Sequence, residues 1–394
     1  MPHLFARRCP DGANVCGPRE YFQTEIFIVF TYAPSSCVSP LITTIRFITE
    51  HKYNKMRHII KILIAFFISL LTIWFLGAFL LTTPTICQKD EIIGLPIPIP
   101  GTMKRERKEN WNTFYYGELG LEASDAQRVT STSPKILLFG DSYVEANMVA
   151  PEDRIQAQLS AKGTPCIGIG ISGNRCVEYN HLMNIYDHII SNVHTNILLI
   201  ADISDILPPN KTTDFKSLRP VYPFRKIEGK LGFLSYRLRL MAFRNILKKT
   251  EICFRNGLDF TGNHWRREKT YTLDTSSHKQ YYEAYWRDML NTLKISSNDK
   301  KLLIVYVPIV PRIQNNAIIT EDKETEIFKQ FDKVSHEFGL VGNGILNLEK
   351  RFCDFTLTTH QFPRGFFNTC PGEGHLNADG HRIVAEAIIE ELLK

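Results

Sequence analysis

A run of twenty apolar residues, from Ile62 to Leu81, is the feature that most constrains this chain. It consists almost wholly of Leu, Ile, Phe, Ala and Trp, and the segment from Ile62 to Gln88 carries no charged side chain. At helical rise, a run of this length matches the hydrocarbon core of a bilayer, roughly 30 Å. The sequence therefore predicts one transmembrane helix, placed at residues 59–82. A buried core helix is the alternative, and the length of the run disfavours it.

Positive charge gathers on one side of the apolar run. Four basic residues precede it closely, namely Lys52, Lys55, Arg57 and Lys61, whereas a second basic group, residues 104–108, lies further from its other end. The positive-inside rule then places the N-terminus in the cytoplasm and the rest of the chain outside, in the periplasm or at the cell surface. Because no small-residue cleavage site follows the run, an uncleaved single-pass anchor is favoured over a removed signal peptide.

The first 55 residues differ from the rest of the chain. They hold three cysteines and scattered prolines, with no sustained hydrophobic period and one short apolar patch, residues 26–32. Met56 is followed by a short basic stretch and then the apolar run, which is how a signal-anchor begins. We expect residues 1–55 to be a poorly structured extension and Met56 to be the native start.

Cysteine spacing gives no sign of a metal site. The chain has nine cysteines, and no CxxC or His/Cys cluster has metal-ligand spacing, so we expect no metal and no cofactor. If the region after the anchor is exported, Cys166–Cys176 and Cys353–Cys370 are candidate disulfides. Spacing alone does not decide which cysteines pair.

The chain after the anchor divides into two parts. Residues 83–133 are loop-like, and prolines at positions 96, 98 and 100 give an extended stretch suited to a linker or pre-domain. From residue 134 onward, short apolar runs alternate with helical patterns. We expect strands at residues 135–139, 166–170, 196–200, 301–307 and 345–348, and helices at residues 151–162, 174–191, 280–293, 321–338 and 378–393. Strands separated by helices predict an α/β fold with a central parallel sheet covered on both faces.

One stretch, residues 205–277, breaks this alternation and is interpreted as an insertion. It is rich in Lys and Arg, and residues 231–249 have the spacing of an amphipathic helix. A lid helix packed on the core is the favoured interpretation. A surface for anionic lipid head groups or an acidic glycan is the alternative.

Three of the predicted segments lead into residues that carry chemistry. The first strand runs into Gly140-Asp141-Ser142, the second ends at Gly170, and the loop before the last helix contains Glu373 and His375. In an open parallel sheet, ligands bind beyond the carboxyl ends of the strands, so we expect these segments to meet there. A serine becomes a nucleophile when a histidine takes its proton and an acid orients that histidine. Ser142, His375 and Glu373 are the candidates for these roles.

These motifs resemble those of the SGNH, or GDSL, hydrolase superfamily. Gly140-Asp141-Ser142-Tyr143 is similar to its first block, Gly170 to the glycine of its second, and the stretch from Glu373 to His381 to its last. The resemblance covers about residues 134–394. It implies a flavodoxin-like three-layer sandwich and an activity on ester bonds, by hydrolysis or by transfer of an acyl group.

The resemblance also implies an oxyanion hole. It would consist of the backbone N–H groups of Ser142 and Gly170 and an asparagine side chain from a third block. In this chain that block, residues 200–205, has Ala201 at the asparagine position, and Asn174 is the candidate replacement. Loss of one oxyanion donor typically lowers turnover by about 100- to 1,000-fold. The acid departs too, since many members place aspartate three residues before the histidine, where this chain has Gly372.

Three further polar residues are interpreted as supports. Asp141 is expected to brace the serine turn, Asp202 to support the third block, and His381 to be structural in the last helix. An ordinary α/β-hydrolase is disfavoured, because its nucleophile elbow requires a second glycine where this chain has Val144. The chain also has no Gly-rich dinucleotide motif after a strand and no Walker lysine, so no nucleotide or nucleic-acid partner is expected.

The leading functional hypothesis is a membrane-anchored serine hydrolase that acts on O-acyl esters of a glycan or a lipid. An acyltransferase acting on an envelope polysaccharide through the same acyl-enzyme remains open. A catalytically impaired binding protein of the same fold also remains open, because of Ala201. A lipase-like enzyme that acts on the bilayer itself is a third alternative, suggested by the basic insertion.

Overall fold

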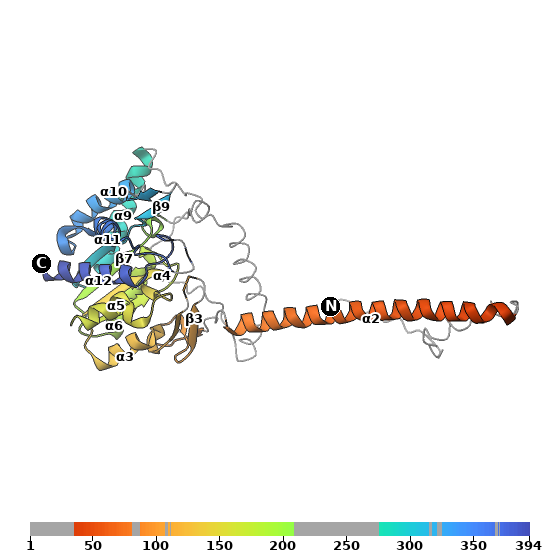
Figure 1. Ribbon diagram of the computed structural model, residues 1–394. Helices are drawn as coiled ribbons and strands as arrows, with labels where there is room; N and C mark the ends of the chain where they lie inside the picture. Colours follow the sequence, from red (N-terminus) through yellow and green to blue (C-terminus); the bar gives the residue numbers. More distant parts are fainter. Residues whose placement is uncertain are drawn as a thin grey trace, which may run out of the picture. The chain divides into compact units, whose positions relative to one another are not determined.

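Helix α2 (Ser35–Leu80) is the first element in the described part of the structure, a computed structural model (Figure 1). The structure describes residues 35–80, 87–106, 109–110, 112–208, 276–314, 317–320, 325–366, 369 and 371–394. The segment His51–Ile73 of α2 has a mean hydropathy of 1.9 and is long and apolar enough to cross a membrane. The chain divides into two compact units, Met1–Ile73 and Trp74–Lys394.

Helix α2 begins earlier than the sequence predicts. Residues 35–55, expected to be poorly structured, form its first turns, whereas residues 1–34 lie outside the described part of the chain. From Leu41 to Leu80 the sequence has no proline and a single glycine, Gly77, so nothing interrupts the helical hydrogen bonds. Most of the predicted insertion falls on residues 209–275, which lie outside the described residues together with the expected amphipathic helix.

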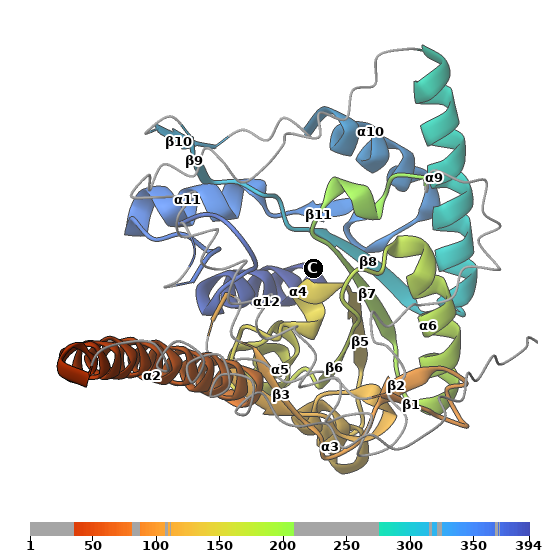
Figure 2. The same cartoon turned by 90° about the vertical axis from the view of Figure 1, so that its right-hand side faces the viewer.

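Five parallel strands form the central sheet of the second unit. They are β5 (Ile136–Gly140), β6 (Cys166–Gly170), β7 (Thr195–Ile200), β8 (Lys301–Tyr306) and β11 (Ile345–Asn347). Their spatial order is β11-β8-β7-β5-β6, and every neighbouring pair is parallel (Figure 2). Counted along the chain, this is the flavodoxin-like order, in which the second strand lies at one edge beside the first. The predicted flavodoxin-like sandwich is therefore confirmed.

Eight helices are described in the second unit. They are α3 (Ala123–Ser131), α4 (Ser142–Glu145), α5 (Ile155–Ala161), α6 (Cys176–Ile189), α9 (Ser276–Ser296), α10 (Thr325–Ser335), α11 (Glu349–Thr359) and α12 (Ala378–Leu393). The sequence patterns do not predict α3, α4 or α11. Helix α4 is a single turn, too short to show a period, and α11 follows Leu348, which makes no side-chain cap.

The helices cover both faces of the sheet because successive strand side chains point in opposite directions. Leu137 and Phe139 of β5 pack in one apolar cluster with residues of α6, α9 and α10. Ile136 and Leu138 pack in a second cluster with residues of α5, α11 and α12. Figure 2 shows these two helix layers on opposite sides of the strands. The central strands β5 and β7 are consequently buried along their whole length.

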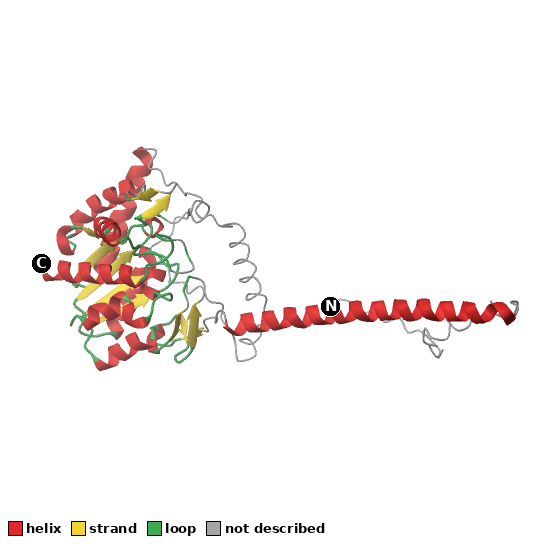
Figure 3. Ribbon diagram, viewed as in Figure 1, coloured by secondary structure: helices red, strands yellow, loops and turns green. Residues whose placement is uncertain are grey.

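The segment between α2 and the sheet is folded, whereas the sequence predicts a loop. It contains two antiparallel pairs, β1 (Cys87–Lys89) with β2 (Pro96–Pro98) and β3 (Met103–Glu106) with β4 (Asn112–Tyr115). Figure 2 labels β1, β2 and β3, and Figure 3 draws the strands in yellow. A third pair, β9 (Arg312–Gln314) with β10 (Ala317–Ile319), follows β8. In the segment between α2 and the sheet, Phe114, Tyr116 and Leu121 are buried, so that segment packs as part of the second unit.

Candidate active site

Ser142 lies at the carboxyl edge of the sheet, where β5 ends and helix α4 begins. The chain leaves β5 for β6 on one side, and β7 pairs with β5 on the other, so this edge is where the strand order reverses. Ligands of open α/β sheets bind at such a point. Asp141 caps α4 and accepts the backbone N–H of Tyr143 at 2.9 Å, which holds the strand-to-helix turn that presents Ser142.

His375 reaches this serine from the loop before α12. Its Nε2 lies 2.8 Å from Ser142 Oγ, although 233 positions separate the two residues in the sequence. The Ser142 hydroxyl has one proton, and its other neighbour, Asp141 Oδ2, lies further away at 3.3 Å. The shorter contact is the one through which a histidine can take the serine proton.

The second ring nitrogen of His375 meets a carboxylate that the sequence interpretation did not include. Glu109 Oε2 lies 2.8 Å from His375 Nδ1 and also accepts the backbone N–H of His375 at 3.0 Å. An ionised carboxylate can only accept, so Nδ1 is assigned the proton and Nε2 is left to accept from Ser142. The side chains of His375 and Glu109 are 20% and 13% exposed, so both are partly shielded from water.

The position that the sequence interpretation assigned to Glu373 is occupied by Glu109. Glu373 is half-buried in the same loop as His375. Gly374 lies between the two, with a φ of 87°, and a Cβ on it would lie 2.8 Å from Glu109 Oε2. Glycine at this position therefore lets the Glu109 carboxylate approach the loop closely enough to bind His375 twice.

A buried arginine fixes the histidine loop. Arg364 is 1% exposed, and its guanidinium donates to the carbonyl oxygens of Val307 and Pro308, just after β8. It also donates to the Tyr143 hydroxyl at 2.6 Å and lies over the Tyr143 ring, 5.0 Å from its centroid. Tyr143 in turn packs against the His375 ring, with the two centroids 4.9 Å apart. Arg364 thus ties the strand end, the serine turn and the histidine loop together.

The third block, residues 200–205, forms a turn that the side chains of Asp202 and Asp205 stabilise. Asp202 accepts the backbone N–H of Ser204 at 2.8 Å, and Asp205 accepts those of Ala201 and Asp202 at 3.2 and 3.3 Å. Burial raises the pKa of Asp141 above its usual value. Burial and the nearby charge of Asp141 raise the pKa of Asp205 well above its usual value. Both predicted supports, Asp141 and Asp202, thus cap short helical turns.

The predicted oxyanion donors lie in the loops around this edge. Gly170 ends β6 beside Gly140, and a Cβ on Gly170 would lie 2.0 Å from the backbone nitrogen of Glu145. This glycine therefore lets α4 pack directly on the strand. Asn174 is buried in the turn after β6, and Ala201 is buried at the end of β7. The methyl group of Ala201 cannot donate a hydrogen bond, so this side chain does not supply an oxyanion donor. The roles of Ser142, Gly170 and Asn174 as oxyanion donors stay predictions.

The buried imidazole of His381 should make the free energy of unfolding depend on pH. It is 1% exposed in α12, and burial, with the charges of Arg154 and His375, lowers its pKa to about 3. An unfolded histidine titrates near pH 6.5, so between about pH 6.5 and 3 the unfolded chain binds more protons than the folded one. The free energy of unfolding should therefore fall by up to about 1.4 kcal/mol per pH unit as the pH drops through this window.

We expect His381→Leu to remove this contribution. Between about pH 6.5 and 4.5, the variant should lose roughly 2–3 kcal/mol less of its free energy of unfolding than the wild type. Urea unfolding of both proteins at the two pH values measures the difference. Equal losses in the two proteins would show that His381 is protonated in the folded state.

The four described cysteines of the second unit form no disulfide. Cys87, Cys166, Cys176 and Cys353 are free thiols. Cys166 packs in the apolar cluster of α5 and α12 and Cys176 in that of α6 and α9, so the two thiols lie on opposite faces of the sheet. The candidate Cys166–Cys176 disulfide is therefore ruled out. Cys353 Sγ lies 3.4 Å from the Thr320 carbonyl oxygen, and its predicted partner Cys370 lies outside the described residues.

The fold and the site define a flavodoxin-like α/β protein with a serine, a histidine and a glutamate in line at the carboxyl edge of its sheet. It resembles SGNH hydrolases in the order and placement of its motifs. No protein-family profile and no curated protein matches the chain.

The solved structures that are similar to it include the following three. One is described as a GDSL-like lipase from Parabacteroides merdae, with 13% identity, 66% of this chain and 95% of that chain covered, and a TM-score of 0.34. Another is a carbohydrate esterase family 2 enzyme with a carbohydrate-binding domain from Corynascus thermopiles, with 9% identity, 66% and 67% coverage, and a TM-score of 0.31. The third is phospholipase A1 from Streptomyces albidoflavus, with 8% identity, 66% and 100% coverage, and a TM-score of 0.36.

Proposed function

We propose that this protein is a serine hydrolase that cleaves acyl esters, with Ser142 as nucleophile, His375 as general base and Glu109 as the acid that orients the histidine. The observation that carries the proposal is a pair of 2.8 Å contacts, from Ser142 Oγ to His375 Nε2 and from His375 Nδ1 to Glu109 Oε2. A serine in such a line is activated for attack on an acyl carbon. Glu109 replaces Glu373 in this triad.

The reaction proceeds through an acyl-enzyme. Ser142 Oγ attacks the ester carbonyl carbon while its proton passes to His375 Nε2, and the imidazolium then gives that proton to the leaving alkoxide. Glu109 stabilises the imidazolium without itself taking the proton. In the second half, His375 removes a proton from water, the resulting hydroxide attacks the acyl carbon, and the carboxylic acid leaves as Ser142 regains its proton.

The negative oxygen of each tetrahedral intermediate needs donors. In this proposal they are the backbone N–H groups of Ser142 and Gly170, with the side chain of Asn174 in place of the missing asparagine at position 201. If Asn174 does not reach the oxyanion, turnover is lower by about 100- to 1,000-fold than in a site with all three donors. The rate of a Ser142-dependent reaction therefore indicates whether Asn174 takes the place of the asparagine missing at position 201.

Placement of the site is the second part of the proposal. The membrane-length segment His51–Ile73 supports a single-pass anchor, and the basic residues before it favour an extracytoplasmic second unit. The substrate is proposed to be an O-acyl ester of a glycan or lipid within reach of that membrane. An acceptor hydroxyl in place of water would make the same acyl-enzyme a transferase.

Isotope-labelled acyl esters test the proposal. Full-length protein in detergent is incubated with a sugar O-acetate, a phospholipid and a simple aryl acetate, each carrying a heavy acyl group. Release of labelled acid by the wild type, and not by Ser142→Ala, supports hydrolysis. Label recovered on an added acceptor sugar identifies a transferase. A folded protein that releases no label and transfers none would contradict the enzyme proposal and favour a binding role.

A further inference from the structure

Glu109 reaches His375 from outside the central sheet. It lies in the connection between β3 and β4, which pair antiparallel from Met103 opposite Tyr115 to Glu106 opposite Asn112. Residues 103–115 are called the pre-sheet hairpin here. A hairpin tip that presents a catalytic carboxylate must be fixed to within a fraction of an ångström, because a misplacement of about 1 Å can cost 100-fold in rate.

Two asparagines beside Glu109 hold the hairpin tip. In the loop 147–149, Asn110 Nδ2 donates to the Met148 carbonyl oxygen at 2.7 Å. Asn112 Nδ2 donates to the carbonyl oxygens of Asn147 and Val149 at 3.1 and 2.6 Å. All three loop residues are buried, so these acceptors belong to a packed part of the unit. The loop directly follows helix α4, whose first residue is Ser142. The three hydrogen bonds therefore join the element that carries the acid to the element that carries the nucleophile.

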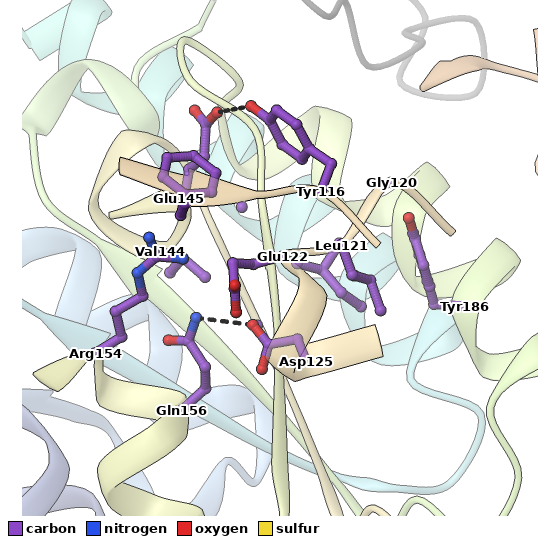
Figure 4. Close-up of a pocket in the computed structure, with 14 residues that line it drawn as sticks. Tyr116, Gly120, Leu121, Glu122, Asp125, Val144, Glu145, Arg154, Gln156 and Tyr186 are labelled. Atoms are coloured by element: carbon purple, nitrogen blue, oxygen red, sulfur yellow. Dashed lines mark hydrogen bonds between the residues drawn. The ribbon is translucent and has the colours of Figure 1, made fainter. Parts of the chain in front are cut away.

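A small cavity lies next to the base of the hairpin. A cavity of about 20 Å³, large enough for one water molecule, lies between residues 114–125 and the sheet (Figure 4). Across it, the Tyr116 hydroxyl donates to Glu145 at 3.3 Å, and the buried Arg154 guanidinium lies 4.7 Å from the centroid of the Phe114 ring. Buried Phe114 packs the base of the hairpin, whereas the asparagine bonds are side-chain contacts that hold its tip beside Glu109.

We infer that Asn110 and Asn112 are positioning residues of the active site, which fix the hairpin tip so that Glu109 and Ser142 meet opposite nitrogens of one imidazole. The kinetic part of this inference rests on the proposed function, whereas the positioning itself does not. By this inference, the catalytic unit begins before the sheet, and the segment between the anchor and β5 is part of the active site.

Kinetics of Asn112→Ala test the inference. The variant removes two of the three bonds and keeps the backbone pairing of β4. We expect kcat to fall roughly 10- to 100-fold with KM changed less than about threefold, because Glu109 acts in the transition state. In a Glu109→Gln background, the same change should cost less than about threefold, since no carboxylate remains to be positioned.

A spectroscopic measurement tests the positioning without any substrate. In full-length protein labelled with ¹⁵N-histidine, a proton held between His375 Nδ1 and Glu109 should give a low-field resonance. Glu109→Gln and His375→Ala should lose it, and Asn112→Ala should lose or broaden it. Tyr115→Thr is the matched control, because Tyr115 lies on the same strand and is 52% exposed, and it should keep the resonance. Asn110→Ala serves as the second variant if Asn112→Ala does not fold.

Each outcome decides between the alternatives. If Asn112→Ala lowers kcat equally in the wild-type and Glu109→Gln backgrounds, or leaves the resonance unchanged, the positioning role is overturned and the ester chemistry still stands. A wild type without the resonance would overturn the contact between Glu109 and His375 and the inference with it. Loss of the resonance in Asn112→Ala, in a protein that hydrolyses no ester, would support the positioning and refute the proposed function.

Discussion

Replacing Ser142 with alanine should lower kcat for ester hydrolysis by at least about 10⁴-fold. The change removes the nucleophilic oxygen and leaves His375, Glu109 and the predicted oxyanion donors in place. Any remaining rate would come from water that attacks a bound ester, which the oxyanion donors and substrate binding still favour. Steady-state hydrolysis of an aryl acetate by the full-length protein measures the loss.

Ser131→Ala is the control for this change. Ser131 is the exposed last residue of α3, so the variant should keep the wild-type kcat. The described contacts of the Ser142 hydroxyl are with His375 and Asp141 only, so Ser142→Ala should remain folded. Retention of more than about a tenth of wild-type kcat in folded Ser142→Ala would exclude Ser142 as the nucleophile, because the loss of a triad member costs far more.

Glu109→Gln is the second change with a large expected effect, a fall in kcat of about 10²- to 10⁴-fold. The glutamine is nearly the same shape but carries no charge to stabilise the His375 imidazolium. Its amide nitrogen can also donate to Nδ1, which favours the tautomer whose Nε2 cannot accept from Ser142. Because the amide keeps most of the packing, kcat should change much more than the free energy of unfolding.

Glu373→Gln distinguishes the two candidate acids. Glu373 precedes Gly374 in the sequence, whereas Glu109 comes near Gly374 in space and lies 2.8 Å from His375 Nδ1. We therefore expect Glu373→Gln to change kcat by less than about threefold, as for a charge outside the triad. The reverse order, with Glu373→Gln the more damaging change, would restore the interpretation drawn from the sequence and remove Glu109 from the mechanism.

The central sheet was predictable because its strands are buried on both faces. A parallel strand covered by two helix layers is largely apolar, and residues 136–139 are apolar at every position. All five strands are found within one residue of their predicted ends. The same logic led to Ser142, which follows a strand, and to His375, in the loop before the last helix, since both segments were expected to meet at one edge of the sheet.

Glu109 was not predictable, because nothing local marks it. It lies 266 positions before His375, in a polar stretch between short strands, and it reaches the histidine only through docking of the pre-sheet hairpin. One signal was present in the sequence: Gly374, beside the histidine, is the kind of residue that allows close approach of another group. The glycine shows where a neighbour comes near, but the identity of that neighbour requires the tertiary structure.

Short elements and long-range pairs account for the other differences. Helix α4 has four residues and no period, and the hairpins before the sheet have strands of three or four residues, below the length at which alternation is recognisable. Cys166 and Cys176 were candidates for a bridge if the region is exported, yet one residue begins a strand and the other a helix on the opposite face. Which face a residue occupies follows from the packing of the layers.

The most direct test of the account is the site at which a fluorophosphonate reacts with the folded full-length protein. Such a reagent phosphonylates a serine whose hydroxyl is activated by a general base. We expect peptide mapping to find the adduct on Ser142, and its rate of formation to fall by at least about 10³-fold in His375→Ala. No adduct on Ser142, or an adduct that forms equally fast without His375, would contradict the account.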